Sequence, residues 1–142
     1  MIYLDTSVLG AIFFREPGAA DVSRNIASRR GEGLSVSAWV LTEMASVGGI
    51  KERTGAIDAG MRQEAMARFQ RFVTAQLTLW EVEPGDFRTA SVLLESPFAL
   101  RAGDALHLAI ARRLRARLDS LDRRQIAAAE GLGIGVIQPA DA

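Results

Sequence analysis

The stretch Met1-Ile-Tyr-Leu-Asp-Thr-Ser-Val-Leu-Gly10 indicates both a fold class and a candidate site. Its apolar run at 2–4 is typical of a short buried strand. The run stops at Asp5, and Ser7 is a suitable N-cap for a helix running through Phe14. A strand followed at once by a helix is the first half of a strand–helix–strand unit.

The same alternation continues along the rest of the chain. Strands separated by helices pair in parallel through right-handed crossovers, with helices on both faces of the sheet. The sequence therefore predicts an α/β protein, a three-layer α/β/α sandwich. The expected strands cover 34–36, 77–82, 118–121 and 134–137, and the expected helices cover 17–30, a segment capped by Ser37, 56–75, 84–94, 102–114 and a last segment that begins at Asp122.

Length and composition restrict the class of protein. The 142 residues, 49% of them hydrophobic, suit a single domain spanning residues 1–142. The absence of cysteine excludes disulfides, thiolate metal sites and a thiol nucleophile. No apolar run reaches the roughly 18 residues that cross a bilayer, and residues 1–14 lack the basic start and cleavage site of a signal peptide. We therefore expect a cytoplasmic protein with no membrane partner.

The distribution of arginine is more informative than the net charge, since seventeen basic and seventeen acidic residues cancel. A local arginine stripe is typical of a nucleic-acid surface, because guanidinium groups pair well with phosphate. A solvated helix face explains such a stripe equally well. The stripe comprises Arg112, Arg113, Arg115, Arg117, Arg123 and Arg124, and of these Arg112, Arg113, Arg123 and Arg124 are the candidate RNA-binding residues.

Four carboxylates are candidates for one site: Asp5, Glu43, Asp104 and Asp122. Asp5 and Asp122 each follow an expected strand, and ligands of open parallel sheets bind beyond the carboxyl ends of the strands. Three of the four have local alternative explanations. Asp5 could satisfy nearby backbone donors, Asp104 could answer a helix dipole, and Asp122 could simply cap the last helix.

Glu43 has no local explanation of this kind. It interrupts an apolar helix face that includes Trp39, Val40 and Val47. Lys51, the only lysine, is two turns away, so no local ion pair is available. A carboxylate on a buried face is normally paired, protonated or bound to a metal.

Four carboxylates in one crevice repel one another, and a divalent cation removes that conflict. Oxygen ligands, no cysteine and a single histidine favour Mg²⁺ or Mn²⁺ over zinc. Such a cation neutralises phosphate charge and lowers the pKa of a bound water, which predicts phosphodiester hydrolysis of RNA. We interpret His107, one turn after Asp104, as a packed or hydrogen-bonded helix residue rather than an acid–base group.

Four segments, in this order and at this spacing, carry a family resemblance: Ile2-Tyr-Leu-Asp-Thr-Ser-Val-Leu9, Ser37-Ala-Trp-Val-Leu-Thr-Glu43, Arg101-Ala-Gly-Asp-Ala-Leu-His-Leu-Ala109 and Ser120-Leu-Asp-Arg-Arg-Gln125. Together they resemble the PIN-domain superfamily, and most closely the VapC-type toxin ribonucleases of type II toxin–antitoxin systems. The resemblance covers essentially the whole chain.

This resemblance implies a parallel five-stranded sheet and an endoribonuclease that depends on Mg²⁺ or Mn²⁺. The four carboxylates match the family's acidic quartet, with Asp5 and Asp104 as principal metal ligands and the other two completing the site or orienting the attacking water. Thr6 and Ser120 match polar positions that support it. The resemblance also implies a homodimer and inhibition by a VapB-type antitoxin.

The sequence departs from the family at Asp119, where an apolar strand residue is usual, and at Arg115, where a small turn residue is common. A charge in a buried strand needs solvent or a partner, and Arg117, Arg115 or an exposed edge would supply it. We expect Asp122 rather than Asp119 to be the metal ligand, because strand ends face the crevice and strand middles do not.

Two other functions stay open at this point. The segment Leu4-Asp-Thr-Ser7 faintly resembles the nucleophile strand of haloacid-dehalogenase-type phosphatases, although these need a second aspartate where Ser7 stands and a catalytic lysine. The other is a PIN-like module that binds RNA or a partner without turnover, which the intact acidic quartet disfavours.

Overall fold

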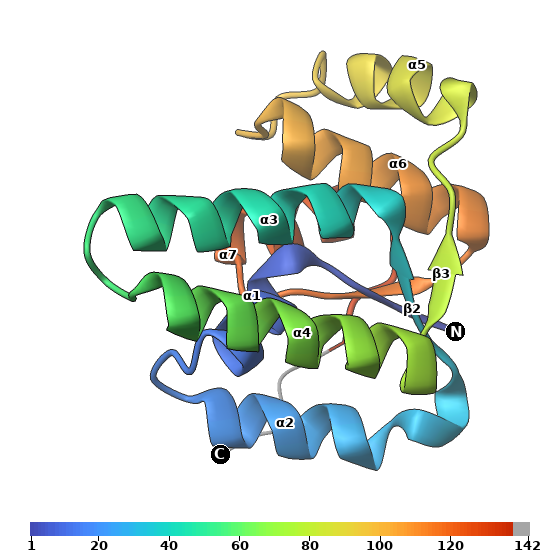
Figure 1. Ribbon diagram of the computed structural model, residues 1–142. Helices are drawn as coiled ribbons and strands as arrows, with labels where there is room; N and C mark the ends of the chain where they lie inside the picture. Colours follow the sequence, from blue (N-terminus) through green and yellow to red (C-terminus); the bar gives the residue numbers. More distant parts are fainter. Residues whose placement is uncertain (138–142) are drawn as a thin grey trace.

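The computed structural model describes residues 1–137 and shows a parallel sheet flanked by helices (Figure 1). All neighbouring strands pair in parallel, so the predicted α/β class is confirmed. The strands lie in the order β3-β2-β1-β4. They are β1 (Ile2–Leu4), β2 (Leu34–Ser37), β3 (Thr78–Trp80) and β4 (Arg117–Asp119).

Helices connect these strands. In Figure 1, α3 and α4 run side by side across the front of the sheet, and α5 and α6 form a pair above it. No helix within residues 1–137 is both long and apolar enough to span a membrane. The helices are α1 (Thr6–Phe13), α2 (Ala19–Ser28), the 3-10 turn η1 (Arg30–Glu32), α3 (Ala38–Arg53), α4 (Ala59–Gln76), α5 (Pro84–Leu93), α6 (Ala102–Leu114) and α7 (Arg123–Gly131).

The first helix begins two residues earlier than predicted, because its N-cap is Asp5 rather than Ser7. The Asp5 carboxylate accepts hydrogen bonds from the backbone N–H groups of Ser7 at 3.1 Å and Val8 at 3.4 Å. α2 begins two residues later than predicted, after Gly18, whose φ of 86° lies in the region that favours glycine.

The predicted five-stranded sheet is wrong in its strand count, since the described residues form a four-stranded sheet. Residues 134–137 make one isolated parallel bridge, between Leu118 of β4 and Val136. Two backbone hydrogen bonds of 2.8 Å hold the segment there: the N–H of Leu118 donates to the carbonyl of Gly135, and the N–H of Ile137 donates to the carbonyl of Leu118. It therefore runs beside β4 in the expected direction but pairs too briefly to form a strand.

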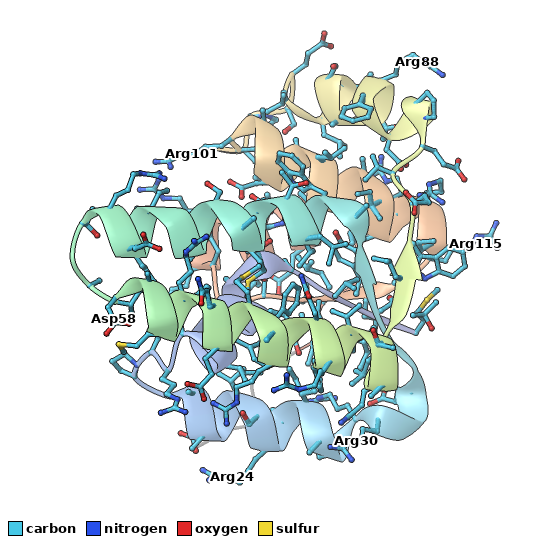
Figure 2. The ribbon with its side chains drawn as sticks, in the orientation of Figure 1. Arg24, Arg30, Asp58, Arg88, Arg101 and Arg115 are labelled. Carbon is cyan, nitrogen blue, oxygen red and sulfur yellow. The ribbon has the colours of Figure 1, made fainter. Side chains whose placement is uncertain are left out.

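The core surrounds β1 and includes the middle of α6. The side chains at 2–4 have no exposed surface. Every residue from 105 to 111 is buried, so α6 is enclosed on most of its circumference. Side chains fill the space between the sheet and the helices (Figure 2). His107 belongs to this buried run, and a polar ring in such a place requires hydrogen-bond partners.

A buried ion pair joins α5 to α6. Asp86 is 2% exposed and accepts two hydrogen bonds from Arg113, one from Nε at 2.8 Å and one from Nη2 at 2.9 Å. The same guanidinium donates to the carbonyl of Glu81 at 3.1 Å. This two-point pairing satisfies a carboxylate that burial would otherwise penalise. The Arg113 guanidinium, predicted to bind RNA, is thus engaged within the fold.

We expect Asp86→Asn to lower the free energy of unfolding by about 3 kcal/mol, because it leaves the guanidinium of Arg113 without its charged partner. Glu83→Gln is the matched control, since Glu83 is exposed and contacts Arg113 at 3.3 Å; its cost should stay below about 1 kcal/mol. Urea denaturation measures both values. Equal losses in the two variants would contradict the assignment.

Candidate active site

One cleft brings the four predicted carboxylates together. It has a volume of about 410 Å³, and Asp5, Glu43, Asp104 and Asp122 all line it. It lies beyond the carboxyl ends of β1 and β4, which pair in parallel as direct neighbours. This is the edge at which an open parallel sheet binds its ligands.

Asp5 is the most enclosed of the four, with 2% of its surface exposed. Burial raises the pKa of its carboxyl, and the charge of His107 together with hydrogen bonds from Ser120, Ser7 and the Val8 backbone oppose that rise. A carboxylate held this way is costly to ionise without a cation beside it.

Asp104 stands in the first turn of α6, where its carboxylate accepts a hydrogen bond of 3.4 Å from the backbone N–H of Arg101. Burial raises the pKa of Asp104, and the negative charges of Asp122 and Glu43 raise it further. The electrostatic conflict predicted for the cluster is therefore present at this carboxyl.

Asp122 is the N-cap of α7, as the local alternative predicted. Its Oδ1 accepts hydrogen bonds from the backbone N–H groups of Arg124 at 2.9 Å and Gln125 at 3.4 Å. The hydroxyl of Ser120 accepts a bond of 3.0 Å from the backbone N–H of Asp122. β4 ends at Asp119, so Asp122 follows a short loop and not the strand itself.

Glu43 has a long-range partner that its own helix does not reveal. Its Oε1 accepts a hydrogen bond from Thr6 Oγ1 at 2.7 Å and is bonded to His107 Nε2. The other ring nitrogen, His107 Nδ1, is bonded to the hydroxyl of Tyr3 at 2.7 Å, and that hydroxyl also contacts Ser37 Oγ at 2.8 Å. A continuous chain of hydrogen bonds thus runs from β2 through β1 and α6 to α3.

This chain confirms that His107 is a packed, hydrogen-bonded residue, and it changes the acidity of two of its members. Burial alone would raise the pKa of Glu43, but the hydrogen bond and charge of His107 and the hydrogen bond of Thr6 lower it on balance. Burial raises the pKa of Tyr3 far above its ordinary value, so its hydroxyl stays protonated.

Ser7 is a member of the site that the sequence reasoning missed, since it was assigned only as a helix cap. Its hydroxyl donates to Asp5 Oδ1 at 2.5 Å and accepts a bond of 2.9 Å from the backbone N–H of Leu121. It therefore ties the end of β1 to the loop that leads to Asp122. The position of this serine two residues after Asp5 was the available signal.

Asp119 points to a different place from the four carboxylates. It lines a small hollow with Arg29 and Val22 and is not among the residues that line the cleft. Burial raises its pKa to about 6, the charge of Asp5 adds to the rise, and Arg29 opposes it. Arg117, one of the expected partners, pairs instead with Glu32.

The predicted RNA-binding arginines are divided between two environments. Arg113 is engaged by Asp86, and Arg112 Nη2 donates to the carbonyl of Leu132 at 2.8 Å. Arg123 and Arg124 are exposed in the first turn of α7, directly after Asp122. Of the four arginines, Arg124 lines a cavity that shares Asp104 and Asp122 with the carboxylate cleft.

The donor set fits a hard divalent cation, although no ligand cage is preassembled. Within residues 1–137, no three acidic or histidine side chains stand close enough together to hold a metal ion. Glu43, Asp104 and Asp122 each receive their hydrogen bonds on one carboxylate oxygen, and the second oxygen has no donor in that part of the chain. Available carboxylate oxygens that repel one another are what Mg²⁺ or Mn²⁺ would bind.

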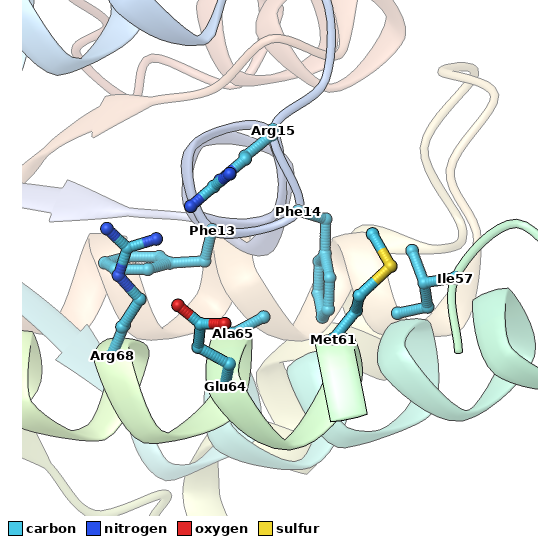
Figure 3. A pocket seen from close by; sticks show the side chains of 8 residues that line it. All are labelled: Phe13, Phe14, Arg15, Ile57, Met61, Glu64, Ala65 and Arg68. Atoms are coloured by element: carbon cyan, nitrogen blue, oxygen red, sulfur yellow. The ribbon is translucent and has the colours of Figure 1, made fainter. Parts of the chain in front are cut away.

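A second hollow lies between α1 and α4 and has different chemistry (Figure 3). It has a volume of about 100 Å³, and Phe13, Phe14 and Met61 form much of its wall. Glu64 is its single carboxylate, beside Arg15 and Arg68. One carboxylate with two cations is a poor metal site, so this hollow does not compete with the cleft.

Comparisons with known proteins agree with this fold. The PIN domain family matches residues 2–131. Ribonuclease VapC46 of Mycobacterium tuberculosis is 33% identical over 141 residues, which is 97% of each chain. FitAcB from Neisseria gonorrhoeae shares the fold, with a TM-score of 0.77 and 16% identity over 98% of each chain. VapC20 of Mycobacterium tuberculosis, a sarcin–ricin loop cleaving toxin, has a TM-score of 0.73 and 19% identity over 98% of this chain and 100% of its own.

The chain therefore belongs to the PIN-domain family. Within that family it is similar, over nearly its full length, to a VapC ribonuclease.

We expect Tyr3→Phe to lower the free energy of unfolding by about 1–3 kcal/mol, because it removes the hydroxyl that bridges His107 and Ser37 in the core. Ser37→Ala is the control, since it leaves the bond between Tyr3 and His107 in place; its cost should be smaller. Guanidinium denaturation measures both. A Tyr3→Phe variant as stable as the parent would show that the chain is not needed for folding.

We expect Asp119→Asn to stabilise the protein at pH 8 and to have little effect at pH 4. The folded-state pKa of about 6 lies above the unfolded value near 3.8, so the folded protein holds this proton more tightly. The cost of ionising Asp119 in the folded protein is absent below about pH 4, grows as the pH rises, and is complete above about pH 6. Its size is about 2 kcal/mol, since one pKa unit is about 1.4 kcal/mol and solvent screens part of it.

Denaturation curves of both proteins at the two pH values test this expectation. A stabilisation that is equal at pH 4 and pH 8 would rule out ionisation of Asp119 as its cause.

Proposed function

We propose that this chain is an endoribonuclease that depends on Mg²⁺ or Mn²⁺, is the toxin of a type II toxin–antitoxin module, and acts in the cytoplasm as a single PIN-like domain over residues 1–142. The observation that carries the proposal is the convergence of four carboxylates on one cleft. The similarity to ribonuclease VapC46 supports RNA as the substrate.

In this proposal Asp5 and Asp104 are the principal metal ligands. Both have raised pKa values because they are desolvated, and Asp104 also faces the charges of two other carboxylates. A divalent cation, when bound, would neutralise the scissile phosphate and lower the pKa of the attacking water. Asp122 would complete the ligand set through its available oxygen, directly or through water.

Glu43 would complete the site from α3. His107 and Thr6 hold its Oε1, so its Oε2 is kept in one orientation. The lowered pKa of Glu43 favours the ionised carboxylate, which can orient the attacking water and accept its proton. Thr6 and Ser120 support the site by fixing Glu43 and the backbone at Asp122.

The RNA strand would be held by Arg123 and Arg124 at the start of α7. Arg112 and Arg113, whose guanidinium groups hold Leu132 and Asp86, would add positive potential without direct contact. The partners are RNA and a VapB-type antitoxin, which a related toxin–antitoxin complex from Klebsiella pneumoniae supports, and the chain would form a homodimer.

The alternative of a haloacid-dehalogenase-type phosphatase lacks its catalytic lysine. Lys51 pairs with Glu16 at 3.3 Å and does not line the cleft, so Asp5 has no neighbouring lysine to stabilise an acyl phosphate. A module that binds without cleaving is separated from the ribonuclease by the experiment below.

Asp5→Asn and Asp104→Asn should each reduce RNA cleavage in Mg²⁺ or Mn²⁺ by about 100-fold or more, because each removes a charged ligand. The amide at position 5 retains an acceptor for the helix cap, so the fold should persist. EDTA should abolish cleavage by the parent, and added Mn²⁺ should restore it. Gel analysis of a panel of structured RNAs measures cleavage.

Glu95→Gln is a matched control, because Glu95 is exposed and lies outside the cleft. Mn²⁺ should also raise the melting temperature of the parent, and Asp122→Asn should reduce that rise more than Asp119→Asn does. Parent protein that cleaves none of these RNAs in Mg²⁺ or Mn²⁺ would refute the proposal, and Mn²⁺ or RNA binding without cleavage would favour the non-catalytic module. A larger effect of Asp119→Asn would reverse the assignment of Asp122.

A further inference from the structure

We propose that Arg101 and Arg124 form a phosphate subsite that holds the RNA phosphate next to the one being cleaved. This inference rests on the ribonuclease function proposed above and adds a binding site to it. Arg101 is not part of the arginine stripe recognised in the sequence.

The two arginines share a cavity that adjoins the carboxylate cleft. It has a volume of about 290 Å³ and is lined by Ala99, Arg101, Asp104, Asp122 and Arg124. Asp104 and Asp122 line both this cavity and the cleft, so the two spaces adjoin at these two carboxylates. The outer cavity adds two arginines to this shared acidic lining.

Both guanidinium groups are available for a ligand. Arg101 and Arg124 are exposed, and neither guanidinium group has a hydrogen bond or an ion pair within residues 1–137. Arg101 lies at the outer edge of the molecule near the start of α6 (Figure 2). By contrast, Arg113 and Arg117 are engaged by acidic side chains.

The backbone places each arginine in register with a carboxylate. The N–H of Arg101 donates to Asp104, and the N–H of Arg124 donates to Asp122 at 2.9 Å. The turns that hold the two carboxylates therefore also hold the backbone of the two arginines. A metal ion bound by the carboxylates and a phosphate bound by the arginines would keep a fixed spacing.

A nucleic-acid strand is the ligand that this arrangement suits best. Its charges are spaced regularly, so a strand with one phosphate in the cleft has the next within reach of the adjoining cavity. Arginine forms two parallel hydrogen bonds with phosphate oxygens.

The test is the binding of a fluorescein-labelled oligouridylate, measured by anisotropy in Ca²⁺ over a range of salt concentrations. Ca²⁺ takes the same oxygen ligands as Mg²⁺. The double variant R101Q/R124Q should bind about tenfold more weakly. Its slope of log affinity against log salt should be smaller by about 0.7, since the subsite holds one phosphate and each phosphate neutralised on a single strand contributes about 0.7. R101K/R124K should keep most of the slope, because it keeps the charges.

The matched control is R71Q/R88Q, which removes two exposed arginines that are equally without partners in the described residues and that line neither cavity. It should change neither the affinity nor the slope by a comparable amount. Denaturation curves verify that all variants fold.

If R101Q/R124Q binds RNA as the control does while the parent cleaves RNA in Mg²⁺, the subsite is refuted and the ribonuclease function stands. If the arginine variant instead loses antitoxin binding alone, the pair serves a protein partner and the subsite is likewise refuted. If R101Q/R124Q loses RNA binding but the parent cleaves no RNA, the subsite is supported and the ribonuclease function fails.

Discussion

The chain of hydrogen bonds from Tyr3 through His107 to Glu43 is the constraint on which the candidate site depends. It crosses the core, where an unpaired polar group would be strongly destabilising. By satisfying both nitrogens of the buried imidazole it allows His107 of α6 to lie against Tyr3 of β1, and it brings a carboxylate from α3 to the same cleft. The orientation of Glu43 is therefore a property of the core as much as of the surface.

Local patterns predicted much of this architecture. The apolar run at 2–4 and the helix at 102–114 have the observed bounds, because burial and capping act over a few residues. The convergence of Asp5 and Asp122 could also be foreseen, since it requires only that the first and fourth strands be neighbours. The interruption of an apolar helix face by Glu43 correctly indicated an unusual partner.

Features that depend on distant neighbours could not be predicted. Nothing near Glu43 in the sequence indicates His107, which lies 64 residues away. Arg113 belongs to a basic stripe by sequence, but Asp86 engages it because α5 folds against α6. The segment 134–137 has the composition of a strand, yet its pairing is limited to a single bridge with β4.

Asp5, Asp104 and Asp122 satisfy the backbone at the starts of α1, α6 and α7, so under the proposed function three of the four carboxylates have two roles at once. Most substitutions at these three positions would therefore lower the amount of folded protein as well as its activity. Only a change from aspartate to asparagine, which has nearly the same shape, would remove the negative charge and leave the helix cap in place. A population escaping the activity of this protein would consequently tend to lose the whole molecule rather than keep an inert copy of it.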